Sequence, residues 1–390
     1  MTDRINNIQI CSRGVWDSTV PGIFFDDNGV SNYAHMLEDL IQEYPRGEKG
    51  KNDWAKIVDK VKQKGKNKKY DCIIGISGGT DSSYLLHLAK EYNLKPLAVN
   101  LDNGWNSEIS VKNIKKLTSD LNIDLETYVI DYEEMKDILR SYIRASFPWI
   151  DVPTDMAIQA VLYKIASREK IKYIFNGADF RSEGKQPVEW TYSDSRQLKY
   201  IFKTFGSGKL KTFPYLTFTK LFYLGFVKRI KVYRPFYYLE YQKKNAQAFL
   251  SQQYGWEYYG GHHHENVFTK FAISYWLPKK FNIDKRLITL SAQILSGEIN
   301  RTEALNMLFT QSYDSNTIVR DINYVLKKLN IKESEFEKIM LSENKYYFNY
   351  PSNYKIRTLI IKFLKPFIKL IVPIKLPVFF EMESRKQKKS

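Results

Sequence analysis

Residues 77–83 have the types and spacing needed to bind an anion; they read Ser77-Gly78-Gly79-Thr80-Asp81-Ser82-Ser83. The two glycines let the backbone approach a ligand closely and take turn conformations that a side chain would forbid. The serine hydroxyls add donors to an oxyanion, and Asp81 is suited to hold a magnesium ion or the start of a helix. The run therefore predicts a phosphate-binding loop.

The segments on either side of this loop indicate how it would be held. Residues 71–76 form a short apolar run typical of a buried strand, and residues 81–92 carry apolar side chains at helical spacing. A loop between a strand and a helix start directs unpaired N–H groups and the positive helix end at a ligand. It lacks both the Gly-Lys-Ser/Thr ending of a Walker loop and the G-x-G-x-x-G spacing of dinucleotide folds. The alternative is a glycine turn that binds nothing.

From residue 66 onward the pattern alternates between strands and helices, which predicts an α/β fold with a doubly wound parallel sheet. Strands are expected at 71–76, 95–101, 125–130 and 171–175, and helices at 81–92, 107–121, 132–144 and 154–169. Ligands of such sheets bind beyond the carboxyl ends of the strands. We therefore expect Asp102, Gly177, Asp179 and Glu183, which follow two of these strands, near the loop. Carboxylates beside a triphosphate require Mg²⁺ or basic partners; alternatively, these residues cap helices.

The whole chain divides into five predicted segments. Residues 1–65 form an N-terminal leader, with a β-hairpin near 21–30 and helices near 33–43 and 54–63. Residues 66–195 form the sheet domain. They are followed by a basic, aromatic insertion at 196–238, a mostly helical region for substrate or partner at 239–347, and a basic amphipathic tail at 348–390.

The net charge of +17 is concentrated in two stretches. Residues 196–234 hold ten basic residues and no acidic one, and residues 355–390 hold ten basic and two acidic ones. Both are rich in aromatic and aliphatic side chains, which indicates a surface for anionic lipid headgroups or an acidic partner protein. A nucleic-acid surface and a solvated basic face over ordinary core helices are the alternatives.

Signs of secretion or membrane insertion are absent from the sequence. No charge-free apolar run is long enough to span a bilayer, and the N-terminus has no signal-peptide pattern. The two cysteines, Cys11 and Cys72, argue against a disulfide framework. We therefore expect a cytoplasmic protein, soluble or peripheral at the inner face of the membrane.

Three of the five histidines, His262, His263 and His264, are consecutive. Adjacent histidines on one loop rarely ligate a single metal ion, and no second ligand cluster accompanies them. We expect them to bind an acidic sugar, pyrophosphate or an adenylylated intermediate, together with nearby lysine and arginine side chains. A metal site and a structural role are the alternatives.

Taken together, several stretches resemble the N-acetyl sugar amidotransferases of bacterial surface polysaccharide biosynthesis. The stretches are Cys11–Asp26, the loop at 77–83, the run G-W-x-Y-Y-G-G-x-H-x-E-x-x-F-T-K-F at 255–271, residues 277–286, and Leu290-Ser291. These enzymes belong to the PP-loop, or N-type ATP pyrophosphatase, superfamily. The resemblance implies that ATP, with Mg²⁺, adenylylates the acetamido oxygen of an N-acetylated nucleotide sugar or nonulosonic acid. Ammonia then displaces AMP and leaves an acetamidino sugar for lipopolysaccharide O-antigen or a related surface glycan.

The loop pattern and the resemblance together assign roles to individual residues. The catalytic assignments are Asp81, His263, Glu265 and Lys270, with Asp81 also the candidate magnesium ligand. ATP and pyrophosphate binding is assigned to Ser77, Gly78, Gly79, Thr80, Asp81, Ser82, Ser83, Asp102, Gly177, Lys285 and Arg286. Substrate contacts are assigned to Asp179, Glu183, His262 and His264.

The resemblance also implies partners. A class II glutaminase needs a cysteine at its processed N-terminus, whereas Thr2 follows Met1 here. Ammonia is therefore expected from a separate glutaminase subunit with a cyclase-like subunit, as in the family. The family's two Cys-x-x-Cys pairs read here Cys11-Ser12-Arg13-Gly14 and Ser31-Asn32-Tyr33-Ala34. Three of four ligands are missing, so no zinc is expected.

Two other functions stay open. The basic charge favours a tRNA-modifying PP-loop enzyme, although thiolation chemistry usually requires reactive cysteines and nucleic acid is not the expected partner. The second is a non-catalytic scaffold of a polysaccharide assembly, which the missing cysteines of the two Cys-x-x-Cys pairs suggest. The intact loop at 77–83 argues against a scaffold.

Overall fold

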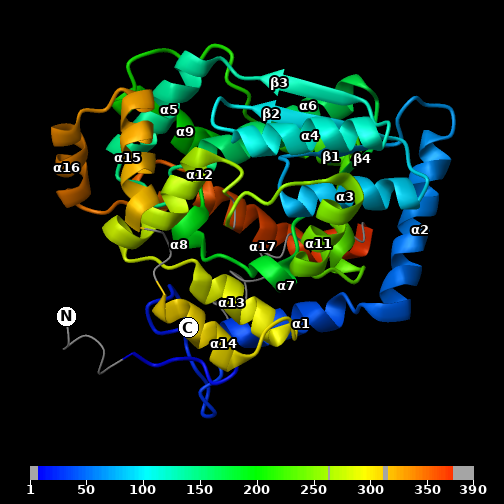
Figure 1. Ribbon diagram of the computed structural model, residues 1–390, viewed down its shortest axis with the longest axis horizontal. Helices are drawn as coiled ribbons and strands as arrows, with labels where there is room; N and C mark the ends of the chain where they lie inside the picture. The colour runs from blue at the N-terminus through cyan, green and yellow to red at the C-terminus, as the bar shows by residue number, and fades with distance from the viewer. Residues whose placement is uncertain (1–7, 262–263, 311–314, 372–390) are drawn as a thin grey trace.

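A five-stranded sheet lies at the centre of the computed structural model, which describes residues 8–261, 264–310 and 315–371 (Figure 1). The strands are β1 Cys72–Gly75, β2 Pro96–Asp102, β3 Leu125–Val129, β4 Tyr173–Phe175 and β5 Lys231–Tyr233. They pair in parallel in the order β3-β2-β1-β4-β5, so the winding of the chain reverses at β1. The predicted doubly wound α/β fold is confirmed.

Strand β5 is the one strand that the sequence pattern did not predict. It lies within the basic segment 196–238 and pairs with β4, Tyr173 opposite Lys231. Three residues are too few to show the two-residue period of a strand. The other four strands and the four helices expected between them are present, with their ends shifted by a few residues.

Helices account for most of the remaining chain. Those up to the end of β4 are α1 Asn32–Glu43, α2 Gly47–Gly65, α3 Thr80–Glu91, α4 Glu108–Asp120, α5 Tyr132–Arg144 and α6 Val152–Arg168. Those between β4 and the start of α12 are α7 Phe180–Glu183, α8 Val188–Thr191, α9 Ser195–Phe205, α10 Phe218–Phe222, the π-helix η2 Tyr223–Val227, the 3₁₀ turn η3 Pro235–Tyr237 and α11 Lys243–Tyr254. The last are α12 Val267–Phe271, the π-helix η4 Ala272–Phe281, α13 Arg286–Leu295, α14 Arg301–Phe309, α15 Ser315–Leu329, α16 Glu333–Leu341, the 3₁₀ turn η5 Tyr347–Asn349 and α17 Tyr354–Ile371.

A helix that crosses a bilayer must be both long and apolar. Within residues 8–261, 264–310 and 315–371, no helix combines the necessary length with sufficient apolar character.

Successive side chains of a strand point to opposite faces of the sheet, and both faces are covered at the central strands β1, β2 and β4. The edge strand β3 instead alternates between exposed and half-buried residues. Ile73, Val99 and Ile174 pack with α6 on one face. Cys72 and Ile74 pack with α2, α3 and α4 on the other. This two-sided burial explains why β1 and β4 read as short continuous apolar runs rather than alternating ones.

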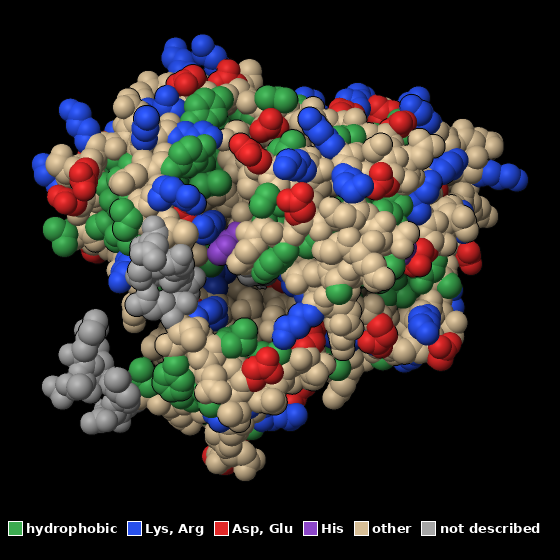
Figure 2. Space-filling model, in the orientation of Figure 1, with side chains coloured by type: hydrophobic (Ala, Val, Ile, Leu, Met, Phe, Trp, Pro, Cys, Tyr) green, Lys and Arg blue, Asp and Glu red, His purple; other side chains and the backbone are tan. Residues whose placement is uncertain are grey.

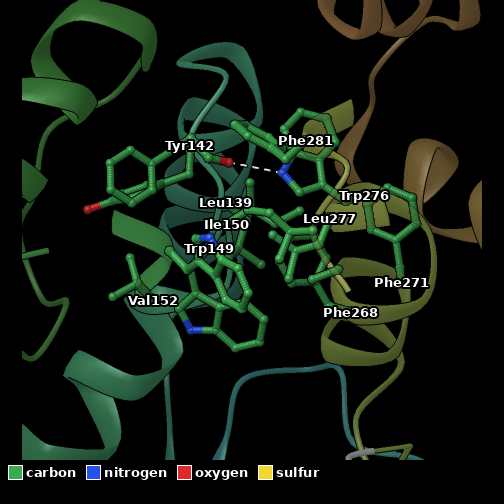
Figure 3. Packing of buried hydrophobic residues seen from close by; sticks show 14 of the residues in the cluster. Leu139, Tyr142, Trp149, Ile150, Val152, Phe268, Phe271, Trp276, Leu277 and Phe281 are labelled. Carbon is green, nitrogen blue, oxygen red and sulfur yellow. Dashed lines mark hydrogen bonds between the residues drawn. The ribbon is translucent and has the colours of Figure 1, made fainter. Parts of the chain in front are cut away.

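The largest apolar cluster joins α1, α5 and the segment before α6 to α12, η4 and the helices that follow them (Figure 3). Figure 3 shows Trp149 and Ile150 from the segment before α6 facing Phe268 of α12 and Leu277 of η4. The indole nitrogen of Trp276 donates to the carbonyl of Phe147 over 2.9 Å, which ties η4 to the end of α5. The end of the motif at 255–271 is thereby packed against the segment between α5 and α6.

The hairpin predicted near residues 21–30 is a tight turn closed by one antiparallel bridge, between Phe25 and Ser31. The carboxylate of Asp26 accepts the N–H groups of Asn28 and Val30, each over 2.9 Å, and Gly29 takes a positive φ of 71°. An Asx turn and a left-handed glycine therefore satisfy the backbone locally.

The segments around Cys11 and Ser31 meet in the structure. The N–H of Ser31 donates to Sγ of Cys11 over 3.3 Å, and both residues are buried with Ala34. Ser31 also caps α1, because its hydroxyl accepts the N–H of Ala34. Hydrogen bonding and apolar packing thus hold these two segments together.

Candidate functional site

The loop at 77–83 connects β1 to α3 and is closed by hydroxyl groups. The N–H of Ser77 donates to Oγ of Ser82 over 3.2 Å, and the N–H of Gly79 donates to Oγ of Ser77 over 3.3 Å. The N–H of Thr80, at the start of α3, donates to the hydroxyl of Tyr259 over 3.1 Å. Backbone N–H groups and hydroxyls thus lie together at one helix start, where the hydroxyls now accept the hydrogen bonds that a phosphate would take over.

The two glycines of the loop are needed for different reasons. Gly78 has φ +77°, and a Cβ there would lie 2.3 Å from the carbonyl oxygen of Ser110. A Cβ on Gly79 would lie 3.0 Å from Oε1 of Glu265. The first glycine is required by backbone conformation and close packing, and the second leaves room beside the carboxylate of Glu265.

Asp81, in the first turn of α3, is held by Tyr241, which precedes α11, and by Lys243, the first residue of α11. The hydroxyl of Tyr241 donates to one carboxylate oxygen, and the ammonium of Lys243 lies 2.9 Å from the other. Burial alone would lower the pKa of Lys243, but the charges of Asp81 and Glu183 more than offset it, so this pKa is raised. Lys243 therefore stays protonated beside the loop.

Further acidic and basic residues surround this pair. A Cβ on Gly177 would lie 3.1 Å from the carbonyl oxygen of Asp81, so the segment after β4 touches the loop. Asp179 caps α7 and forms a 2.8 Å ion pair with Arg46, while its burial raises its pKa. Burial, with the charge of Asp179 added, raises the pKa of Glu298 to about 7. The site thus holds several carboxylates balanced by Lys243 and Arg46.

The motif at 255–271 reaches the loop through the end of β2. The N–H of Ser107 donates to the carbonyl of Glu265 over 2.8 Å, and the N–H of Val267 donates to that of Trp105 over 3.0 Å. The indole nitrogen of Trp256 donates to the carbonyl of Gly78 over 3.0 Å. These bonds bring Glu265 of the motif beside Gly79 of the loop, so the two sequence motifs lie at one place. Asp102 instead accepts the N–H of Gly104 in its own turn.

The remaining predicted residues lie in different settings. Lys270 forms a 2.5 Å ion pair with Asp321. His264 is placed beside Gly261, with its N–H donating to the carbonyl of Gly261 over 3.3 Å. His262 and His263 fall outside the described residues.

Lys285 and Arg286 are neighbours in sequence but have different surroundings. The ammonium of Lys285 lies 4.1 Å from the ring centre of Trp149, and burial lowers its pKa against the opposing charges of Asp155, Glu183 and Asp151. The guanidinium of Arg286 pairs with Asp284 at 2.7 Å and donates to the carbonyls of Met307 and Thr310 at the end of α14. Arg286 therefore fastens α14 to the start of α13.

One face of the molecule is hollowed near this site. Figure 2 shows the hollow between the part that carries α12 and the part that carries α13 and α14, with lysine or arginine side chains and a histidine around it. Basic groups at such an opening would attract an anionic substrate.

Whether Asp81 can bind a magnesium ion depends on the hydrogen bonds that its carboxylate already accepts. Both of its oxygens accept hydrogen bonds, one from Tyr241 and one from Lys243. No three His, Cys, Asp or Glu side chains in the described part of the chain are grouped to hold a metal ion. An ammonium and a metal ion compete for one carboxylate, so Asp81 does not fit as a ligand in this arrangement unless Lys243 moves.

Sequence reasoning missed several residues of the site, namely Arg46, Tyr241, Lys243, Tyr259 and Glu298. Tyr259 lies within the recognised motif at 255–271, which offered a signal for it. The pairing of Lys243 with Asp81 spans a sequence separation of 162 residues, and no spacing rule links positions so far apart.

Comparisons with known proteins give one family match. Residues 265–364 match the model for the C-terminal domain of WbpG-like lipopolysaccharide biosynthesis proteins. An uncharacterized protein of Methanocaldococcus jannaschii is 35% identical over 97 residues, which is 25% of this chain. This chain spans only 34% of the length of that relative.

The solved structures that match this chain are only weakly similar to it in fold and in sequence. A predicted tRNA methyltransferase subunit from Methanocaldococcus jannaschii has a TM-score of 0.28 and 13% identity, covering 46% of this chain and 75% of its own. The NH₃-dependent NAD synthetase of Campylobacter jejuni has a TM-score of 0.27 and 13% identity, covering 76% and 95%. The NMN synthetase of Francisella tularensis has a TM-score of 0.26 and 14% identity, covering 64% and 95%. With TM-scores this low, none of them informs the reaction.

Proposed function

We propose that this protein is an ATP-dependent amidotransferase that converts the acetamido group of an N-acetylated bacterial sugar into an acetamidino group. The observation that carries the proposal is the meeting of two elements at one point. Glu265 of the motif at 255–271 lies beside Gly79 of the loop at 77–83. The match of residues 265–364 to a lipopolysaccharide biosynthesis domain supports a sugar substrate.

The proposed reaction has two steps. The acetamido oxygen attacks the α-phosphorus of ATP, an O–P bond forms, and pyrophosphate leaves with the electrons of the broken α–β bond. Ammonia then attacks the imidate carbon, the C–O bond breaks, and AMP leaves with the oxygen while protons pass to solvent. Because an amide carbon is a poor electrophile, the enzyme must mainly position the groups and stabilise charge.

The described residues suit these tasks. The N–H groups and hydroxyls of the loop would bind the departing pyrophosphate, and the protonated Lys243 would offset its charge. Because Glu265 lies beside Gly79, we assign it the task of orienting the attacking ammonia or the sugar amide.

Thiol chemistry is less well supported than amidine formation. Burial, with the charge of Asp71 added, raises the pKa of Cys72 well above its ordinary value. Cys11 is also buried, and its sulfur accepts the N–H of Ser31. Because the thiolate is the reactive form, the raised pKa of Cys72 disfavours it as the thiol of a thiolating enzyme, and burial keeps Cys11 away from a substrate.

Incubation with ATP, Mg²⁺ and an ammonium salt, over a panel of N-acetylated nucleotide sugars and nonulosonic acids, tests the proposal. The expected result is substrate-dependent release of AMP and pyrophosphate. Mass spectrometry should show a product in which NH replaces one oxygen. Supplying glutamine instead of ammonium should give no product without an added glutaminase. ATP binding without any amidine product over the whole panel would contradict the proposal.

A further inference from the structure

One surface of the protein combines exposed apolar side chains with an excess of positive charge. It is formed by the start of α9, by α10 with η2, and by the first half of α17, and is called here the basic aromatic surface. Figure 1 shows α17 on the side away from the viewer. The N–H of Asn353 donates to the carboxylate of Asp194, which caps α9, so these helix starts are neighbours.

The apolar part of this surface consists of two ridges. On α10 and η2, Phe222 and Phe226 stack with ring centres 4.4 Å apart and are both exposed, and Val227 beside them is 62% exposed. On α17, exposed apolar side chains recur at i, i+3 and i+7; they are Ile356, Leu359 and Phe363. Such spacing places them on one stripe of the helix. Large apolar side chains grouped this way indicate an interaction surface.

A pocket of about 390 Å³ lies between the starts of α9, α10 and α17, and Ile356 of the second ridge is part of its lining. Its basic lining residues are Arg196, Lys199 and Arg357, and its hydroxyl-bearing ones are Ser195, Thr217 and Thr219. No acidic residue belongs to its described lining. The guanidinium of Arg357 lies 5.7 Å from the ring centre of Tyr192 and 6.0 Å from that of Phe218, which holds it in place. Guanidinium, ammonium and hydroxyl donors around one space suit a phosphate group.

More positive charge surrounds the ridges. Lys220, Arg229 and Lys231 are exposed around α10 and η2, and Lys355 and Lys362 are exposed on α17. Residues 196–234 contain no acidic side chain. Aliphatic side chains such as Val227 and Leu359 cannot stack on bases, so the combination fits an acyl-chain and headgroup boundary better than nucleic acid.

We propose that the basic aromatic surface binds a membrane containing anionic phospholipid, with the pocket around Arg196, Lys199 and Arg357 taking a lipid phosphate. The two apolar ridges enter the boundary between headgroups and acyl chains, and the surrounding lysines face the headgroups. This inference stands independently of the proposed reaction, because none of its residues belongs to the site around the loop at 77–83.

Vesicle flotation with the full-length protein tests the proposal. Vesicles of phosphatidylcholine containing phosphatidylglycerol should carry the protein upward, whereas vesicles of phosphatidylcholine alone should carry much less. Raising the salt concentration should weaken binding without abolishing it, because the apolar ridges contribute as well. Equal flotation with neutral and anionic vesicles would overturn the proposal, as would no flotation with either.

Variants separate this surface from other routes to the membrane. Arg196→Gln with Lys199→Gln should lower the vesicle affinity about fivefold for each charge removed. Phe222→Ser with Phe226→Ser should lower it about tenfold or more. The matched controls are Phe309→Ser with Leu341→Ser for the apolar pair, and Lys112→Gln with Lys115→Gln for the charges; all four residues are exposed elsewhere.

The outcomes are distinguishable. Loss of flotation in the surface variants, with the controls unchanged and all variants unfolding at the parent temperature, supports the proposal. Unchanged flotation in both surface variants would overturn it, because another segment would then carry the binding. Binding of the protein to tRNA that the same variants abolish, without flotation of the parent, would assign the surface to nucleic acid and also overturn it.

Discussion

The ammonium of Lys243, at the first residue of α11, lies 2.9 Å from the carboxylate of Asp81, in the first turn of α3. The two side chains are each 19% exposed, so the pair lies at the boundary between solvent and the interior. The contact joins the loop at 77–83 to the start of α11. A positive charge is thereby fixed where the loop would receive an anion.

Replacing Lys243 with glutamine should remove this charge and leave Asp81 with the Tyr241 hydroxyl alone. We expect pyrophosphate release to fall by about 10²-fold, the usual effect of deleting one preorganised electrostatic contact. The free energy of unfolding should fall by about 1–3 kcal/mol, since a half-buried carboxylate loses its partner. Steady-state pyrophosphate release and urea unfolding measure the two effects.

Lys244 offers the matched control, because its side chain is 84% exposed and its ion pair with Glu303 is long, at 3.9 Å. Lys244→Gln should change stability by less than about 0.5 kcal/mol and leave turnover intact. Equal losses of turnover in the two variants would show that general surface charge, and not the pairing with Asp81, matters.

Gly78→Ala tests the conformation of the loop. The residue has φ +77°, and the added Cβ would lie 2.3 Å from the carbonyl oxygen of Ser110. We expect a loss of about 2–4 kcal/mol in stability from strain and overlap, together with loss of ATP binding by calorimetry.

Gly225 in η2 provides the comparison, because a Cβ there meets no atom within 4 Å. Gly225→Ala should leave ATP binding unchanged and raise stability by up to about 1 kcal/mol, since alanine loses less backbone entropy. If Gly78→Ala bound ATP as the parent does, the loop at 77–83 would not be the nucleotide site.

The sequence predicted the parts of the site that depend on local pattern. The loop at 77–83, its flanking strand and helix, and the nearness of Gly177 follow from rules about neighbouring residues and strand ends. The pairings of Asp81 with Lys243 and of Asp179 with Arg46 depend on how distant segments pack. Residues this far apart in one sequence carry no spacing signal, so only the folded arrangement reveals them.

For Arg286 the sequence predicted a role in ATP and pyrophosphate binding that its contacts in the structure do not suggest. Its guanidinium holds Asp284 and the carbonyls at the end of α14. We expect Arg286→Gln to lower the free energy of unfolding by about 1–3 kcal/mol, because those carbonyls lose their charged donor. The dissociation constant for ATP, measured on the folded protein at low temperature, should stay near that of the parent. A large rise in that constant without destabilisation would restore the sequence-based role.

Glu298 should make the stability of the protein depend on pH. Its pKa is raised from 4.5 to about 7, first by burial and then by the charge of Asp179. The folded protein therefore binds more protons than the unfolded chain between these two values, and stability falls as pH rises through that window. Because the side chain is partly solvated, we expect the loss to be about 1–2 kcal/mol rather than the full value of the shift.

Urea unfolding at pH 5 and pH 8 measures the effect of Glu298. Glu298→Gln, which is uncharged at both pH values, should resemble the parent at pH 5 and exceed its stability at pH 8 by about 1–2 kcal/mol. Glu303→Gln, on the neighbouring helix α14, serves as the control and should keep the pH dependence of the parent. If Glu298→Gln also kept that dependence, the carboxyl of Glu298 would be ionised in the folded protein at pH 5, and the charge balance around Asp179 and Lys243 would have to be reassigned.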